Sequence, residues 1–178
     1  NYDGLVFGRI TRWSSGKIHP DWNKIVEEIL NEIPESKCLI FTDKVNIVNR
    51  PFLEHERMIY DHSCKINMFK GNFLKQLSIY VHTNGHFKET FSFAIIEAMA
   101  TGLPIIYLTE HTGVLEEVIG DAGIRCETIE QVKQSIVKML KDKNYRIKYG
   151  RKAKERSKIF NKEEMINKFN RIIKECLR

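Results

Sequence analysis

Apolar residues occur along this chain in short, nearly uninterrupted runs, separated by segments in which apolar and polar positions repeat with helical spacing. The runs span residues 5–10, 37–42, 64–69, 77–83, 104–108 and 123–127. Runs of this length are typical of strands buried on both faces of a sheet. Six such strands alternating with helices predict an α/β fold: one Rossmann-like, three-layer domain with a six-stranded parallel sheet, covering residues 1–178.

The segments between the runs predict the helices. Helical spacing, helix-capping residues and prolines favour helices over 21–33, 51–62, 92–101 and 112–120, followed by an almost entirely helical C-terminus from Thr128 onward. In parallel sheets of this kind, ligands bind beyond the carboxyl ends of the strands. The residues that follow the predicted strands, at 9–17, 42–46, 83–92 and 109–113, are therefore the candidates for function.

One charged residue interrupts the stretch from Phe91 to Ile106, and it is the carboxylate of Glu97. A helix that is apolar nearly all round is expected to be buried on every face. A buried carboxylate costs several kcal/mol unless it is hydrogen-bonded or neutralised. Glu97 could meet this cost by facing a ligand crevice and accepting hydrogen bonds from two ribose hydroxyls. The alternative is a structural carboxylate that caps the backbone amides of a neighbouring loop.

The start of the same predicted helix favours an anion. Backbone N–H groups at Thr90, Phe91 and Ser92, together with the positive end of the helix dipole, form a candidate phosphate site. Glu89 lies eight residues before Glu97, at the mouth of the crevice.

Cations for a diphosphate are available after the first strand. They are Arg9 and Lys17, with Arg12 in reserve. The sequence contains no Asp-x-Asp metal motif, so we predict that the diphosphate is held without a metal and without a cofactor.

Three motifs resemble those of a known enzyme family. "ETFSFAIIEAMATGLPII" is similar to the E-x7-E signature of retaining glycosyltransferases of family 4, "FGRITRWSSGK" to their phosphate loop, and "TGVLEEV" to their G-G-x-P-E-x-V segment. The resemblance runs through the whole chain. It implies the C-terminal, donor-binding half of a two-domain GT-B enzyme, and we expect the chain to be a fragment that lacks the N-terminal acceptor domain.

The resemblance also implies roles for individual residues. Arg9 and Lys17 would hold the diphosphate, Glu89 would touch the donor sugar, and Glu97 would bind the ribose. The backbone amides around Phe91, Ser92 and Phe93 would bind phosphate, while Thr42, Asp43 and Lys44 would contact the base. Two departures from the family pattern matter. Ser92 replaces the usual glycine, and the loop between Arg9 and Lys17 is longer, so that Arg12 can share its role.

The implied reaction transfers a hexose-type sugar from a UDP- or GDP-linked donor to an acceptor hydroxyl of a polysaccharide, glycolipid or glycoprotein, with retained configuration. The isolated chain is expected to be inactive. Three alternatives stay open. The first is the nucleotide-binding domain of another GT-B-type enzyme, such as an epimerase, which product analysis would distinguish. The others are a non-catalytic binding module and a nucleic-acid binder, whose affinity should fall steeply with salt.

The net charge of +6 is concentrated between Lys138 and Lys158. This segment is either a solvated helix face or a surface for an anionic membrane. Aromatic residues are not interleaved there in the way that base-stacking platforms would be, so nucleic-acid binding is not expected. The four scattered cysteines indicate reduced thiols. We therefore predict a cytoplasmic protein with peripheral contact at the inner membrane face.

His82, His86 and His111 are interpreted as ordinary loop residues and not as metal ligands.

Overall fold

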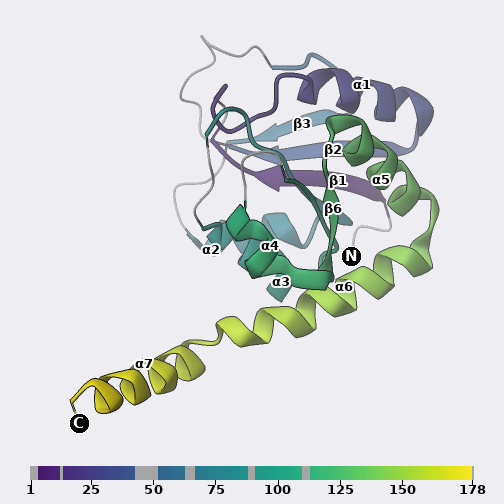
Figure 1. Cartoon of the computed structure of the whole chain (residues 1–178). Helices are drawn as coiled ribbons and strands as arrows, with labels where there is room; N and C mark the ends of the chain where they lie inside the picture. The colour runs from purple at the N-terminus through teal and green to yellow at the C-terminus, as the bar shows by residue number, and fades with distance from the viewer. Residues whose placement is uncertain are drawn as a thin grey trace.

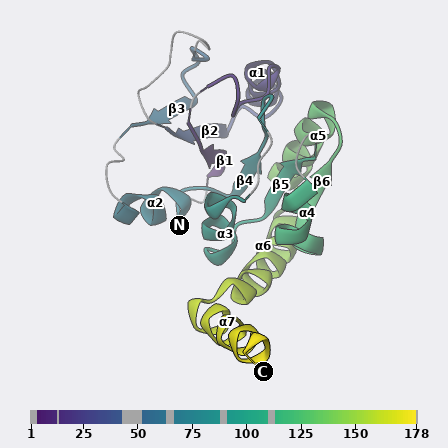
Figure 2. The same ribbon diagram turned by 60° about the vertical axis from the view of Figure 1, so that its left-hand side comes forward.

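Six parallel strands form one sheet in the order β3-β2-β1-β4-β5-β6 (Figure 1; all six strands are labelled in Figure 2). The computed structural model describes residues 4–12, 14–42, 52–62, 67–87, 91–109 and 113–177. The strands are β1 (Leu5–Ile10), β2 (Ser36–Phe41), β3 (Met58–Asp61), β4 (Ile79–His82), β5 (Ile105–Leu108) and β6 (Gly123–Cys126). The predicted six-stranded parallel, Rossmann-like sheet is confirmed.

The order of the strands reverses beside β1. The chain first adds β2 and β3 on one side of β1, then crosses over and adds β4, β5 and β6 on the other side. Because neighbouring connections leave this point in opposite directions, a crevice opens at the carboxyl ends of β1 and β4. The residues that follow these two strands are therefore the best placed to meet a ligand.

Helices cover both faces of the sheet (Figure 2). One apolar core packs α1 (Trp22–Glu32) and α5 (Ile129–Lys141) against the sheet, and the other packs α2 (Asn67–Leu74), α3 (Phe93–Ala100) and α4 (Gly113–Ile119) against the opposite face. Both faces of the central strands are thus buried. This explains why these strands are continuously apolar in sequence, without the alternation of a half-exposed sheet.

The C-terminal helices extend away from this body. A short 3₁₀ turn, η2 (Gly120–Ala122), follows α4, and α6 (Lys143–Ser157) then passes beside the end of α3. A Cβ on Gly150 would lie 2.4 Å from the carbonyl oxygen of Gly102, so only glycine allows this approach. A second 3₁₀ turn, η3 (Lys158–Phe160), leads into α7 (Lys162–Cys176), which projects from the domain (Figures 1 and 2).

Helix α7 shows its apolar side chains to solvent. Met165 is 59% exposed and Phe169 is 64% exposed.

Among the described residues, no helix is long and apolar enough to cross a membrane. Two of the cysteines, Cys38 and Cys126, are buried in the core.

The prediction was wrong for one helix and one strand. No helix forms at residues 52–62; this region instead ends in β3, which pairs with Cys38–Phe41 of β2. The strand predicted at 64–69 is also wrong, because α2 begins at Asn67. The physical reason is that β3 is an edge strand with partly exposed side chains, such as Ile59 at 39%, so it lacks a continuous apolar run.

Candidate functional site

A cavity of about 340 Å³ lies at the carboxyl ends of β1 and β4, where the strand order reverses. It is bounded by the end of β1 and its following loop, by the end of β4 and by the first turn of α3. Its lining residues are Arg9, Ile10, Thr11, Arg12, Lys17, His82, Ser92 and Ala94. Four of the predicted site residues, Arg9, Arg12, Lys17 and Ser92, therefore meet in one place.

Arg9 spans the point of reversal. It lies next to the end of β1, and its side chain is only 1% exposed. One guanidinium nitrogen donates to both the carbonyl and the hydroxyl oxygen of Thr83, the residue after β4, with 2.7 Å to the hydroxyl. These acceptors are neutral, so they orient the guanidinium without removing its charge. Arg9 thus brings a fixed positive charge into the wall of the cavity.

The loop after β1 contributes two further cations. Lys17 is partly buried and Arg12 is exposed, and both line the cavity. The loop between Arg9 and Lys17, which is longer than in the family pattern, therefore places Arg12 at the same cavity as Lys17. A lysine acts on an anion as a point charge and an arginine can bind it bidentately, so the pair can adapt to an oxyanion from two directions.

Close backbone packing fixes this loop against the segment that follows β4. Phe87 donates its backbone N–H to the carbonyl oxygen of Gly16 over 3.2 Å, and its ring covers that glycine. A Cβ added to Gly85 would lie 1.8 Å from the carbonyl oxygen of Ser15. Because two glycines permit this contact, the position of Lys17 depends on the loop after β4.

The start of α3 supplies the helix N-terminus of the site. Ser92 is the N-cap residue as predicted, and it is 6% exposed, but its side chain makes no capping hydrogen bond. The backbone N–H groups of a first helical turn lack partners within the helix and carry a partial positive charge. Ser92 and the first turn of α3 line the same cavity as the three cations.

Phe91 and Phe93 do not line this cavity with their side chains. Phe91 is 40% exposed and Phe93 is 72% exposed, and their ring centroids lie 5.2 Å apart in an edge-to-face contact. Phe91 also faces Phe160 of η3, at 6.4 Å. The predicted contact of their backbone amides with phosphate stays a prediction.

The expectation that α3 is buried on every face is wrong. Glu97 lies in the second turn of α3, but its face of the helix also carries the exposed residues Phe93 and Ala100, and Glu97 itself is only partly buried. The opposite face, with Ile95, is packed into the core. Glu97 is not among the residues that line the cavity. Its predicted contact with a ribose remains a prediction.

His82 is a cavity residue that the sequence interpretation missed. It is the last residue of β4, it is 4% exposed, and both ring nitrogens lack a hydrogen-bond partner among the described residues. Burial, followed by the charges of Arg9 and Lys17, holds the pKa of this imidazole well below its usual value. Its position as the final residue of a buried strand, at the carboxyl edge, was the available signal.

Several predicted residues lie outside the described part of the chain. These are Asp43 and Lys44 of the expected base-binding segment, and Glu89 and Thr90 before α3. Thr42 is described: it is 3% exposed, and its backbone N–H donates to the carbonyl oxygen of Asp61. Within the described ranges, no group of three His, Cys, Asp or Glu side chains is placed to hold a metal ion.

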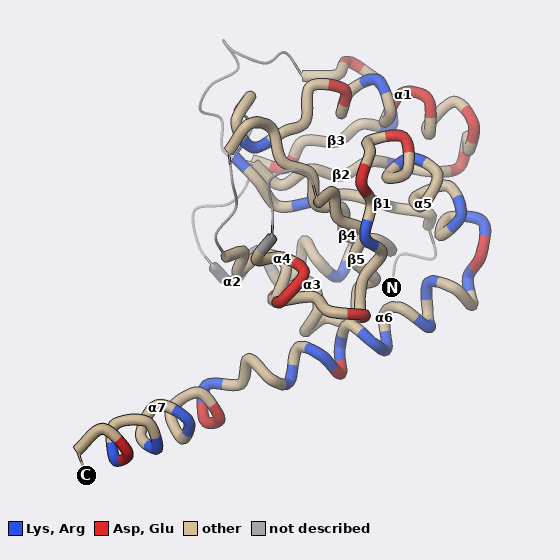
Figure 3. Tube along the Cα trace, in the orientation of Figure 1, with Lys and Arg blue, Asp and Glu red and all other residues tan. Residues whose placement is uncertain are grey.

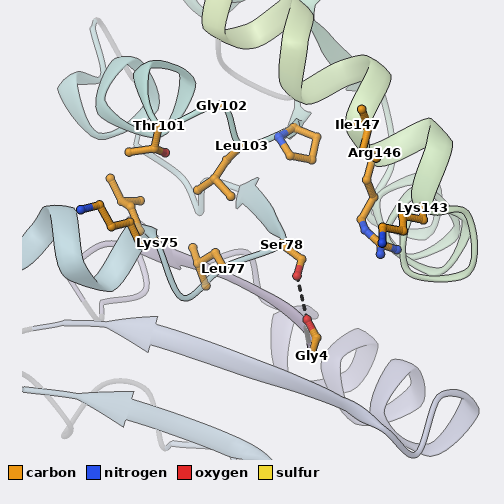
Figure 4. A pocket seen from close by; sticks show the side chains of 12 residues that line it. Gly4, Lys75, Leu77, Ser78, Thr101, Gly102, Leu103, Lys143, Arg146 and Ile147 are labelled. Carbon is orange, nitrogen blue, oxygen red and sulfur yellow. Dashed lines mark hydrogen bonds between the residues drawn. The ribbon is translucent and has the colours of Figure 1, made fainter. Parts of the chain in front are cut away.

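A larger cavity, of about 460 Å³, lies at the amino ends of the strands (Figure 4). Gly4, which precedes β1, accepts a hydrogen bond of 2.8 Å from the Ser78 hydroxyl at its floor, and Lys75, Lys143 and Arg146 stand around it. Arg146 donates to the carbonyl oxygens of Met139 and Leu140, at the end of α5. None of the predicted site residues lines this cavity.

Comparison with known proteins places the fold. A model of the family described as glycosyl transferases group 1 matches residues 66–156, just over half of the chain. No curated protein sequence matches. The C-terminal domain of a glycosyl transferase group 1 family protein (LpcC) from Francisella tularensis is similar with a TM-score of 0.72 and 17% identity, over 89% of this chain and 86% of that one.

Longer enzymes contain the same fold. Sucrose-phosphate synthase from Thermosynechococcus elongatus is similar with a TM-score of 0.77 and 16% identity, over 99% of this chain and 46% of that one. The pneumococcal O-GlcNAc transferase GtfA, solved with UDP and GlcNAc, gives a TM-score of 0.72 and 18% identity, over 98% of this chain and 36% of that one. The chain thus spans less than half the length of these two proteins.

At this level of identity, the solved structures show a shared fold: the Rossmann-like sheet of GT-B C-terminal domains. The family match covers the chain from α2 through β4, α3 and β5 to nearly the end of α6, and so includes one wall of the cavity. On that match, the chain belongs to the family of glycosyl transferases group 1.

Proposed function

We propose that this chain binds the diphosphate of a nucleotide-sugar donor in the cavity at the carboxyl ends of β1 and β4. The observation that carries the proposal is the convergence of Arg9, Arg12 and Lys17 with the N-terminal end of α3 in one cavity. A diphosphate carries several negatively charged oxygens, so it can contact several cations at once. Helix N-termini and arginines both bind phosphate groups favourably. The structure of the pneumococcal transferase was solved with UDP, which supports a nucleoside diphosphate as the ligand of this cavity.

We further propose that the chain acts in a retaining glycosyltransferase of family 4 that transfers a hexose to an acceptor hydroxyl of a polysaccharide, glycolipid or glycoprotein. When the bond between sugar and phosphate breaks, its electron pair stays on the departing diphosphate, which gains negative charge. Fixed cations at that oxygen stabilise the change without a metal. Glu89 would touch the donor sugar. An inverted anomer in the product, measured by NMR with the longer enzyme, would contradict retention, and an epimerised free donor would contradict transfer.

Calorimetric titration of this chain with UDP, GDP, ADP and pyrophosphate tests the site. We expect weak binding of at least one nucleotide, and no sugar transfer by the chain alone. Lys17→Ala should weaken binding by roughly 10- to 100-fold, because hydrogen bonds to charged groups contribute about 1.5–3 kcal/mol. Lys148→Ala removes the same charge from the exposed face of α6 and serves as the control. Equal effects of both substitutions would show non-specific charge attraction only.

The role of Glu97 is tested in the same titration. If the carboxylate accepts hydrogen bonds from the ribose, Glu97→Gln should weaken the binding of a nucleoside diphosphate by about 1–3 kcal/mol. The binding of pyrophosphate, which has no ribose, should not change. Glu175→Gln, on the projecting helix α7, is the matched control. A change in stability with no change in nucleotide affinity would favour the structural carboxylate.

We propose, finally, a cytoplasmic location with contact at an anionic membrane face through α6. Lysines and arginines occur along the whole length of this helix (Figure 3). Lys152 pairs with Asp121 at 2.7 Å, whereas Lys148, Arg151 and Lys154 are exposed. Cations on an exposed helix face are attracted to anionic lipid headgroups. Equal sedimentation of this chain with phosphatidylglycerol and phosphatidylcholine vesicles would contradict the contact.

A further inference from the structure

Two buried polar side chains lie at the end of β4 and just beyond it, close enough for Asn84 to affect the pKa of His82. His82 is 4% exposed and Asn84 is 2% exposed. Neither the ring nitrogens of His82 nor the carboxamide atoms of Asn84 have a hydrogen-bond partner among the described residues. Buried polar groups in native proteins are nearly always hydrogen-bonded, so each exception needs a physical explanation. A ligand that supplies the missing partner is such an explanation when the group lines a cavity, as His82 does.

The direction of the His82 ring follows from the strand. Ile79 and Val81 pack into the core beneath α1 and α5, whereas Tyr80 packs into the core beneath α3. Side chains alternate along a strand, so His82 shares the face of Tyr80. Its ring consequently lies on the same side of the sheet as the first turn of α3, and Ser92 and Ala94 of that turn line the same cavity.

The charged groups around the ring are cationic. Arg9 comes from β1, and Arg12 and Lys17 from the loop that follows it. From β5, the register neighbour is Tyr107, which is buried and whose pKa is raised chiefly by burial, so it is uncharged at neutral pH. From α3, the one charged residue is Glu97, which does not line the cavity.

These surroundings keep the imidazole neutral. Burial is the main cause that lowers the pKa of His82, the charges of Arg9 and Lys17 lower it further, and the side chain of Asn84 acts in the opposite direction. A neutral imidazole has one N–H donor and one acceptor nitrogen. An oxyanion that binds between the cations and the ring offsets their positive field, which favours protonation of the second nitrogen.

We propose that His82 is a ligand of the bound diphosphate, that it donates a hydrogen bond to a phosphate oxygen, and that its ring takes up a proton from solvent when the anion fills the site. This inference rests on the proposed function, since it assigns a further residue to the same cavity. Because binding is coupled to proton uptake, the donor should bind more tightly as the pH falls. Sequence motifs do not mark His82, which is assigned by its burial and by the lack of a hydrogen-bond partner within the described ranges.

The test is calorimetric titration of this chain with UDP-glucose, GDP-mannose and ADP-glucose, whose phosphates carry a fixed charge near neutral pH. Each titration is done at about pH 6 and about pH 8, in two buffers with different ionisation enthalpies, which reports the protons taken up. For a nucleotide sugar that binds, we expect uptake of a fraction of one proton at about pH 6, and roughly three- to tenfold tighter binding there than at about pH 8.

Two variants and a control identify the group. His82→Gln retains an N–H donor but cannot titrate, so binding should persist while proton uptake and pH dependence disappear. His82→Leu removes the donor as well and should weaken binding by roughly 5- to 20-fold. His55→Gln, before the amino end of the edge strand β3, should leave proton uptake unchanged. Thermal melts of each variant check that it folds.

The outcomes separate the two proposals. Binding of a nucleotide sugar by the wild-type chain without proton uptake overturns the inference about His82, whether or not the variants fold, and leaves the proposed function intact. Proton uptake that survives in His82→Gln also overturns it. Failure of all three nucleotide sugars and of pyrophosphate to bind contradicts the proposed function itself.

Discussion

The two ends of the sheet carry cavities of similar kind but different construction. At the amino end, about 460 Å³ is surrounded by Lys75, Lys143 and Arg146. At the carboxyl end, about 340 Å³ is lined by Arg9, Arg12 and Lys17. Each cavity has three cations, so volume alone would favour the amino end. The two cavities differ in what their polar atoms already contact.

Two polar side chains at the amino end already have partners within the protein. Arg146 donates to two carbonyl oxygens that end α5, at 2.5 and 2.8 Å, and the Ser78 hydroxyl donates to Gly4. At the carboxyl end, the buried His82 ring has no hydrogen-bond partner among the described residues, and Arg9 is held in place while fully buried. Buried polar groups that await a partner mark a binding site better than volume does, because burying them without one is costly.

The strongest test of this comparison substitutes one arginine at each end. Arg9→Met should weaken nucleotide binding by at least roughly 30-fold and lower the free energy of unfolding by about 1–3 kcal/mol, since it removes a charge and two hydrogen bonds to Thr83. Arg146→Met should cost about 1 kcal/mol of stability, through the end of α5, and leave binding unchanged. Calorimetric titration and urea denaturation measure both. If Arg146→Met weakened binding as much, the amino-end cavity would become the better candidate.

A second test separates the packing around the site from packing elsewhere. Gly85→Ala places a methyl group against the carbonyl oxygen of Ser15, and should destabilise the domain by about 1–3 kcal/mol and weaken nucleotide binding by displacing Lys17. Gly71→Ala, in α2, meets nothing within 4 Å and should stabilise the domain by about 0.5–1 kcal/mol. Thermal melts and titration show whether the two substitutions differ in sign. Unchanged binding in a folded Gly85→Ala variant would mean that the contact does not position Lys17.

The smallest expected effect is the pH dependence of stability from His82. The pKa of its ring is lowered in the folded state, so the unfolded chain binds a proton more readily once the pH falls below the usual histidine pKa of about 6.5. His82 therefore contributes stability above this pH that is lost on acidification, by at most about 1.4 kcal/mol per pH unit. Urea denaturation between about pH 7.5 and about pH 5.5 should give a shallower pH profile for His82→Gln. Parallel profiles for wild type and variant would contradict it.

The sequence by itself determined the sheet and most of its helices. Five of the six strands coincide with apolar runs, because the two-sided burial of central parallel strands leaves a local signal in the chain. The placement of Arg9 near the end of the first strand and of Lys17 in the loop after it also follows from sequence. Ligands of such sheets bind beyond the carboxyl ends of the strands. The helix start at Ser92 was equally local, as a polar cap before an apolar segment.

Tertiary structure decided what depends on the neighbours of a residue. β3 is a strand because Met58–Asp61 pairs with β2 at the sheet edge, a long-range contact that its mixed polarity does not reveal. Glu97 is only partly buried because one face of α3 is left uncovered, which periodicity in an almost wholly apolar segment cannot distinguish. His82 is assigned a function only because the fold buries it at the cavity that Arg9, Lys17 and the start of α3 also line, with no hydrogen-bond partner in the described part of the chain. Burial and partners arise from residues far apart in the chain, so no local pattern encodes them.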